Sequence, residues 1–193
     1  MFPGEAPLIT FTNEFSDFKY PRNLHYPITE SYELGGIALS NVSRDLDSFV
    51  WKAWTDGSTI YLNRIDTDVV IEVLDDINIK ELDLTFDQNM KICIVYTSED
   101  ITKMYWYDTF EGKQVTTVYP PEVQRPRVSL DDKRRFNISN SDIIFVYQRE
   151  GFLCYRVQRD KYLIEYIIDH QSEYRFLWRI GMGNDRRFLI HWR

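Results

Sequence analysis

Four aspartates stand at matching positions of two segments of this chain, and paired carboxylates are the first chemistry that the sequence could support. Asp87 and Asp131 each end an apolar stretch interleaved with a small polar residue, and Asp108 and Asp160 each follow an aromatic stretch. Two carboxylates about 5–10 Å apart could cleave a glycosidic bond. An aspartate at the end of a strand can also bond the backbone of the next turn. The repetition of these positions favours the structural role.

Metal centres and nucleophilic active sites need several groups at set spacings. His25, His170 and His191 are isolated, and the chain contains no zinc-protease, nucleophile-elbow or phosphate-loop motif. We therefore expect no enzyme, no catalytic residue, no metal and no cofactor. Cys93 and Cys154 are expected to be buried as small hydrophobic side chains of a cytosolic protein, with a disulfide as the alternative.

The aromatic run Tyr105-Trp106-Tyr107 is a candidate contact surface. Alternate residues of a strand point to opposite faces, so this pattern predicts one core side chain with neighbours that are exposed or at an interface. Because tryptophan and tyrosine are enriched at protein interfaces, Trp106 is predicted to contact a partner. A platform that stacks on sugars is the alternative.

The segments that carry these residues repeat along the chain. Each unit has four short apolar runs separated by turn signals, of which Asp56-Gly57 is the clearest. The three units occupy residues 34–76, 77–121 and 127–169, and residues 174–192 complete the series as a closing hairpin. A period of about 40–50 residues indicates radial or stacked β repeats. The predicted fold of residues 34–193 is all-β, with four-stranded antiparallel meanders in a propeller-like arrangement; a β-sandwich is the alternative.

Two details of this prediction can be compared with the structure. The apolar residues Ile77, Ile79, Leu82, Leu84 and Phe86 alternate nearly by two, which predicts a strand with one buried face. Residues 162–168 are predicted to form the last strand of the third unit. That unit also carries an insertion at residues 133–140.

Residues 1–33 are predicted to form an extended N-terminal arm. No apolar stripe recurs there at helical spacing, although residues 7–12 could form one strand that completes the closing half unit and hides its edge. The arm contains scattered aromatic residues that are candidates for contacts with a partner: Phe11, Phe15, Phe18, Tyr20 and Tyr26.

Size and charge limit the classes of function. A chain of 193 residues fits one domain with a small appendage. The formal net charge of −7 disfavours direct binding of nucleic acid. No apolar run is long enough to insert into a membrane, and the N-terminus lacks the features of a signal peptide. These observations predict a protein that is made in the cytoplasm.

Several motifs in order resemble a family of tailed-bacteriophage virion structural proteins. They are LTFDQNM at 84–90, YWYDT at 105–109 with QVTT at 114–117, SLDDKR at 129–134, and a Gly-Met turn before a basic, apolar C-terminus. The resemblance covers residues 40–193. The insertion at 133–140 and the end at 189–192 depart from the family pattern, and these regions would contact partners particular to this virus.

The resemblance implies a non-enzymatic component of the virion, in the tail or at the head–tail junction, that is present in multiple symmetric copies. Its partners would be other tail, connector or fibre proteins, and copies of the chain would form a ring. Its location would be the virion, with the host cytoplasm before assembly. Two alternatives of other classes are a carbohydrate-binding or receptor-binding module of a tail fibre and a capsid decoration protein.

Overall fold

The structure is a computed structural model, and it describes residues 22–24, 36–41, 48–87, 89–131, 141–170, 177–182 and 188–192. These residues form antiparallel β-sheets joined by turns, with one short 3-10 turn, η3 (Gln158–Asp160). The prediction of an all-β fold made of repeated antiparallel meanders is confirmed for the described part of the chain.

Four sheets follow one another along the chain, and within each sheet consecutive strands are neighbours. The first contains β1 (Arg22–Leu24), β2 (Gly36–Asn41), β3 (Ser48–Thr55), β4 (Thr59–Arg64) and β5 (Val70–Asp75). The second contains β6 (Ile79–Phe86), β7 (Ile92–Ser98), β8 (Ile101–Asp108) and β9 (Lys113–Val118). The third contains β10 (Gln124–Asp131), β11 (Asp142–Arg149), β12 (Phe152–Val157) and β13 (Tyr166–His170), and the fourth contains β14 (Leu177–Met182) and β15 (Phe188–Trp192).

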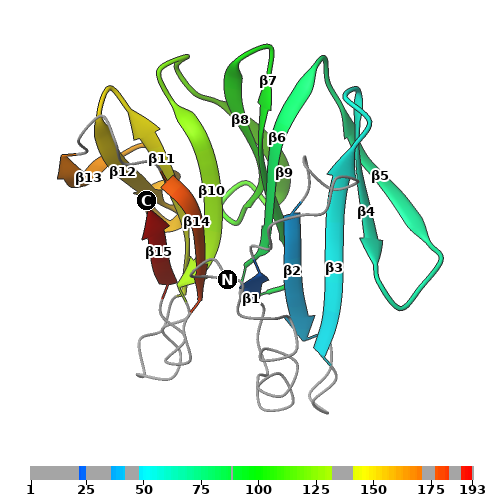
Figure 1. Cartoon of the computed structure of the whole chain (residues 1–193). Coiled ribbons are helices and arrows are strands. Elements are labelled where there is room, and N and C mark those ends of the chain that lie inside the picture. The colour runs from blue at the N-terminus through cyan, green and yellow to red at the C-terminus, as the bar shows by residue number, and fades with distance from the viewer. Residues whose placement is uncertain are drawn as a thin grey trace, which may run out of the picture.

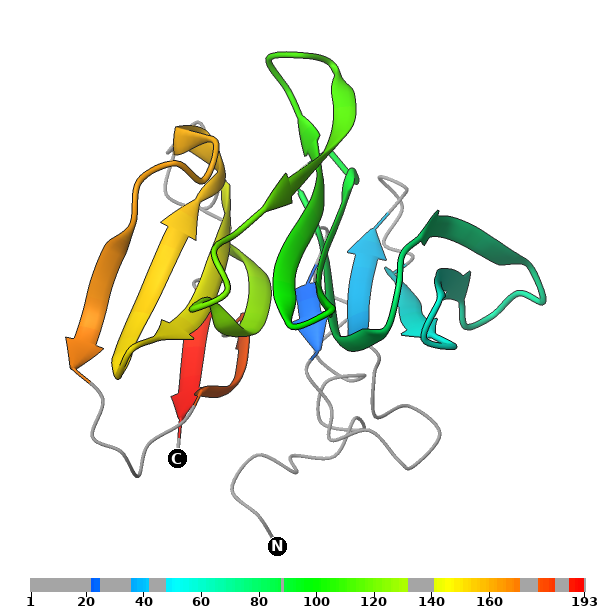
Figure 2. The same cartoon turned by 90° about the horizontal axis from the view of Figure 1, so that it is seen from above.

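One strand from each of the four sheets, here called its leading strand, lies next to the leading strand of the following sheet. These strands are β2, β6, β10 and β14. β2 contacts β6, β6 contacts β10, and β10 contacts β14, while each sheet continues away from this row. Seen from above, the second sheet lies between the first and the third (Figure 2). β1 pairs with β2 and also contacts β14, so the beginning and the end of the series meet beside this row (Figure 1).

Apolar side chains fill the spaces between successive sheets. The cluster between the first and second sheets is the following: Ala53, Ile60, Leu62, Ile79, Leu82, Leu84, Phe86, Ile94 and Tyr96. A larger cluster joins the second and third sheets and includes Val95, Met104, Phe145 and Tyr147. A third cluster, with Val146 and Ile180, joins the third and fourth sheets. The burial of the apolar sheet faces in these clusters holds the meanders together. A single sheet cannot cover its own apolar faces, so each needs a neighbouring sheet.

The β3–β4 hairpin forms where the sequence predicts it, for a local reason. The Asp56 carboxylate accepts the backbone N–H groups of Ser58 and Thr59 at 2.8 and 2.9 Å. These bonds hold the pKa of Asp56 well below its usual range. Gly57 has a φ of 98°, which glycine adopts without strain.

The expectation that β6 buries only one face is wrong for its second half. Asp83 and Thr85 are buried as fully as the apolar residues beside them. The reason is that β6 lies between β2 and β10 and is covered from both sides. The Asp83 carboxylate accepts the backbone N–H of Val128 on β10 at 2.9 Å, which gives this buried polar group a partner in the next sheet.

The strand predicted over residues 162–168 begins four residues later, at Tyr166. Lys161 and Tyr162 both have positive φ angles, 52° and 57°, and two such residues in succession lie outside the backbone conformation of a regular strand. Residues 161–165 therefore form a loop that leads from η3 into β13. It is called the 161–165 loop below.

Part of the predicted arm belongs to a sheet. Residues 22–24 form β1 and pair with residues 37–39 of β2 in antiparallel register. This segment is a strand of the first sheet and not a free arm. The remaining residues of the range 1–33, including the possible strand at 7–12, lie outside the described residues, as does the insertion at 133–140.

Candidate partner-contact site

The 161–165 loop is held by its own backbone. The Tyr162 N–H donates to the Val157 carbonyl at 3.0 Å, and the Leu163 N–H donates to the Asp160 carbonyl at 3.0 Å. These bonds tie the left-handed backbone at the start of the loop to the end of β12 and to η3, the two segments that precede it.

Two side chains dock the loop on the second sheet. The buried Tyr162 ring meets the Trp106 indole edge to face, with ring centroids 4.9 Å apart. The Lys161 ammonium lies 3.2 Å from the Asp108 carboxylate and 4.7 Å from the centroid of the Phe110 ring. The loop thus bridges the third sheet, from which it comes, to β8 of the second.

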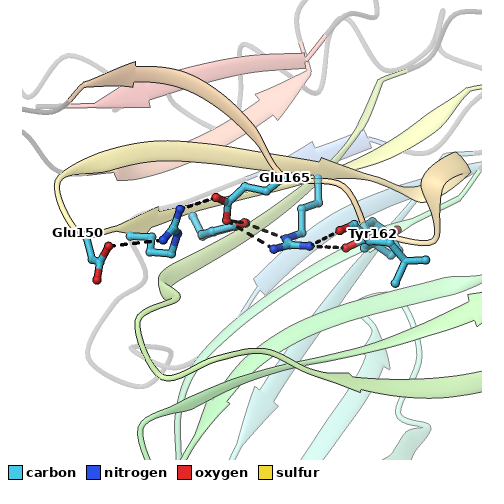
Figure 3. A network of polar contacts seen from close by, with 7 residues as sticks. Glu150, Tyr162 and Glu165 are labelled. Atoms are coloured by element: carbon cyan, nitrogen blue, oxygen red, sulfur yellow. Dashed lines mark hydrogen bonds and ion pairs between the residues drawn. The ribbon is translucent and has the colours of Figure 1, made fainter.

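Arg156 on β12 binds the loop from the third sheet, in the network around Tyr162 and Glu165 that Figure 3 shows. One guanidinium nitrogen, Nη1, donates to the carbonyls of Tyr162 and Leu163, both at 2.9 Å. Nε donates to the Tyr147 hydroxyl on β11 at 2.8 Å. The guanidinium also lies 5.6 Å and 5.8 Å from the ring centroids of Tyr119 and Tyr147. Arginine can make these planar contacts at once because its donors form a rigid fork.

Glu165, the last residue of the loop, completes the network. Its carboxylate accepts hydrogen bonds from the Tyr147 hydroxyl and, at 2.6 Å, from Nη2 of Arg149. Arg156 lies 3.5 Å away on the same carboxylate. Arg149 also reaches the more exposed Glu150 at 3.4 Å (Figure 3). One acid and two arginines therefore lie together at the base of the loop.

The protonation of this network follows from its geometry. Burial opposes the ionisation of Glu165, but the hydrogen bonds from Tyr147 and Arg149 outweigh it and lower the pKa of the carboxyl group. Burial, with the hydrogen bond to Glu165, raises the pKa of the Tyr147 hydroxyl. Near neutral pH, the Glu165 carboxylate is therefore charged and the Tyr147 phenol keeps its proton. These states suit a structural network that holds the loop, and not a group that releases a proton near neutral pH.

The network of Tyr147, Arg149, Arg156 and Glu165 is called the clamp below. The loop that it holds presents two apolar side chains to solvent. Leu163 is 75% exposed and Ile164 is 51% exposed. Exposed apolar side chains on an ordered loop cost little conformational entropy when a partner covers them. The arrangement can therefore act as a contact site whose shape is already formed.

Sequence reasoning missed these two residues because it assigned them to a strand. A signal was present: six of the seven residues at 162–168 are aromatic or aliphatic, without the alternation expected of a strand with one solvated face. The clamp residues come from separate segments of the chain, so no local sequence pattern could predict that they lie together.

Trp106, the predicted contact residue on β8, is only 4% exposed and lies in the core between the second and third sheets. Its indole N–H donates to the Thr117 hydroxyl at 2.9 Å. β8 turns its even-numbered face inward, so Trp106 is the core member of the aromatic run, while Tyr105 and Tyr107 are half-buried. The burial of Trp106 leaves little of its surface for a partner, and the predicted contact there stays a prediction. The candidates Phe11, Phe15, Phe18, Tyr20 and Tyr26 lie outside the described residues.

Three of the four repeated aspartates, Asp87, Asp108 and Asp131, accept backbone N–H groups. Asp87 accepts the N–H groups of Asn89 and Lys91, both at 2.8 Å. Burial raises the pKa of Asp87, and these bonds only partly offset it.

The three other aspartates have different partners. Asp108 accepts the N–H groups of the turn that follows it, at 2.8 and 3.3 Å. Asp131 accepts the N–H of Phe188, 3.4 Å away on β15. Asp160 instead accepts the Tyr166 hydroxyl at 2.9 Å, so it does not repeat the role of Asp108.

Both cysteines are free and fully buried, as the sequence predicts. Burial raises the pKa of the Cys93 thiol and of the Cys154 thiol. Since the thiolate is the reactive form, both side chains act here as packing residues.

Among the described residues, no three His, Cys, Asp or Glu side chains gather closely enough to hold a metal ion. Across the same ranges, no helix has both the length and the apolar composition that a membrane crossing requires. Comparison of the chain with family models, with curated proteins and with solved structures finds no match.

Proposed function

We propose that this chain is a non-enzymatic structural component of a tailed-bacteriophage virion, located in the tail or at the head–tail junction. It would be present in several copies and would bind neighbouring tail, connector or fibre proteins. The observation that carries the proposal is the 161–165 loop, on which two exposed apolar residues, Leu163 and Ile164, stand over a buried charged clamp. A surface of this kind suits a lasting contact with another protein.

The use of the carboxylates supports a role without catalysis. The sequence offers Asp87 and Asp108 as candidate catalytic acids. Their carboxylate oxygens accept backbone N–H groups of the turns that follow them. The bonds hold the ends of β6 and β8 in place. Such groups contribute to the shape of the molecule, since an Asx-type turn is stabilised by the carboxylate that it contains.

A propeller-like arrangement of the sheets belongs to the same proposal. The contacts among β2, β6, β10 and β14 favour it, because the leading strands of propeller blades are neighbours around a common axis. The contact between β1 and β14 also supports the proposal, because it places the first strand of the series beside the first strand of the last sheet.

The decisive experiment uses purified particles of the phage that encodes the chain. Particles banded on a density gradient are digested, and the chain is quantified by mass spectrometry against the major capsid protein. We expect several copies per particle, and we expect them to remain with the tails when heads and tails are separated. Copies that remain with the heads would favour the decoration protein.

Absence of the chain from gradient-purified particles would contradict the proposal. Binding of the purified chain to a glycan array, together with presence in fibres only, would support the receptor-binding module instead. Enzymatic turnover of a polysaccharide, lost in Asp87→Asn, would require an active site and would contradict the non-enzymatic role.

A further inference from the structure

Exposed apolar side chains are concentrated at two places on this molecule. Among the described side chains, eleven large hydrophobic residues are exposed, and nine of them lie near β5 or β13. The set near β5, called the β5 end, is Ile65, Val69, Val70, Ile71 and Ile77. The set near β13, called the β13 end, is Leu163, Ile164, Ile167 and Ile168.

Both sets lie at strands that end a sheet. β5 is the last strand of the first sheet, and β13 is the last strand of the third, so each has a neighbour on one side only among the described strands. Seen from above, they lie on opposite sides of the molecule, with the second sheet between them (Figure 2). An edge strand with apolar side chains is a template for association with another chain.

A third outer strand, β9, provides an internal comparison. β9 ends the second sheet in the same way, yet its sequence is KQVTTV and only Val118 among its large hydrophobic residues is exposed. The lysine of β9 is of a type that protects an edge from association. The middle edge therefore exposes one large hydrophobic side chain, whereas five are exposed at the β5 end and four at the β13 end.

The charges around the two ends are complementary. Four exposed carboxylates surround the β5 end, and they belong to Asp66, Asp68, Glu72 and Asp75. The turn beside the β13 end carries Arg159 and Lys161, which pair within the chain with the buried carboxylates of Asp142 and Asp108 and whose side chains are 59% and 36% exposed. The exposed sides of these two cations would attract an acidic edge and orient the two ends toward each other.

We propose that the β5 end of one copy of this chain packs against the β13 end of a second copy. The contact is heterologous, since it joins two different surfaces of identical chains, and contacts of this type build rings or filaments. The clamp formed by Arg156 and Glu165 then acts as a positioning device that keeps Leu163 and Ile164 in place for the second copy.

This inference deepens the proposed function, because it names the surfaces by which copies would join. Its test needs only the purified chain and no particle. A chain that self-associates but is absent from virions would contradict the proposed function alone, and a chain that is present in virions but does not self-associate would contradict this inference alone.

The test uses two edge variants of the full chain, Ile71→Lys at the β5 end and Ile167→Glu at the β13 end. Each new charge would have to lose its water when the surfaces meet, and each has the same sign as the charged groups that face it in the proposed contact. We expect the wild-type chain to form species larger than the monomer in light scattering. Each variant should weaken this association by about tenfold or more.

Mixing the two variants gives the sharpest result. Each retains one intact surface, so an equimolar mixture should form a pair through the β5 end of the Ile167→Glu chain and the β13 end of the Ile71→Lys chain. The pair should not grow further. If one variant still forms homodimers, the contact joins like surfaces and the proposal is overturned.

Val118→Lys on β9 is the matched control and should leave the association unchanged. Circular dichroism and thermal unfolding show whether each variant is folded, and Val70→Lys replaces Ile71→Lys if that variant is not. A wild-type chain that stays monomeric at about 0.1 mM overturns the proposal. So does a control that weakens association as much as the edge variants.

Discussion

Arg156 joins β12 to β11 and to the 161–165 loop through a single guanidinium group. Its partners are the Tyr147 hydroxyl, two loop carbonyls and the Glu165 carboxylate. The side chain is 16% exposed, so these bonds form largely away from water. A hydrogen bond to a charged group in such surroundings contributes more than one at the surface.

We expect Arg156→Met to lower the free energy of unfolding by about 2–3 kcal/mol, because it leaves Glu165 and two carbonyls without this donor. Chemical denaturation measures the loss, and hydrogen exchange should show faster exchange at residues 161–165. Lys80→Met, which breaks an exposed pair with Asp100, is the control and should change the free energy by less than about 0.5 kcal/mol. Equal effects of the two substitutions would mean that the clamp does not stabilise the loop.

The lowered pKa of Glu165 predicts how the free energy of unfolding changes in acid. Its pKa is lower in the folded chain than in the unfolded chain, so the unfolded chain takes up its proton first. The stabilisation is complete above the ordinary pKa of a glutamate and is lost as the pH falls through the lowered value. In Glu165→Gln, the fall in melting temperature between neutral and acidic pH should be smaller than in the wild type.

A melting profile that is equally steep in both proteins below about pH 5 would contradict this assignment. The comparison has to be made between variants, because other carboxyl groups titrate in the same range. Asp87 acts in the opposite direction, since burial raises its pKa and its ionisation disfavours the fold.

At the scale of single elements, the turn between β3 and β4 shows how one backbone conformation sets a hairpin. Gly57 has a φ of 98°, and a Cβ atom added there would meet nothing within 4 Å. The space around Gly57 would therefore allow a side chain. Glycine is required there by its positive φ angle, which residues with a side chain rarely adopt.

We expect Gly57→Ala to destabilise the chain by about 1 kcal/mol, and Gly57→Asn to cost less, since asparagine tolerates positive φ. Urea unfolding of the two variants measures the difference. A loss several times larger in alanine would indicate a steric clash, which the open space around this position argues against.

At the scale of the whole molecule, the four sheets depend on one another for burial. β6 and β10 are each covered by neighbours from other sheets, and the Asp83 carboxylate bonds β10 directly. β1 belongs to this assembly through β2 and β14, so the segment that precedes β1 is the largest one that can be removed without taking away a described strand.

Deletion of residues 1–21 tests the hypothesis that the aromatic N-terminus docks on a neighbouring protein. We expect the shortened chain to fold, with a circular dichroism spectrum like that of the full chain, and to be missing from purified particles. Incorporation at the normal copy number would rule out a role for these residues in assembly.

Local patterns of the sequence determined the strands and turns. The alternating apolar residues from 77 to 86 located β6, and Asp56-Gly57 located the β3–β4 hairpin, because each pattern depends on residues that are near one another in the chain. The burial of both cysteines was also predictable from their places in apolar runs.

Only the tertiary structure decided which faces are covered. A strand has two faces with similar residues, and Trp106 is buried because the third sheet brings Tyr162 against it. The clamp is likewise invisible in the sequence, since Arg149, Arg156 and Glu165 meet only after β11, β12 and the loop have paired. Exposure and long-range pairing are properties of how distant segments pack, whereas secondary structure follows from neighbours along the chain.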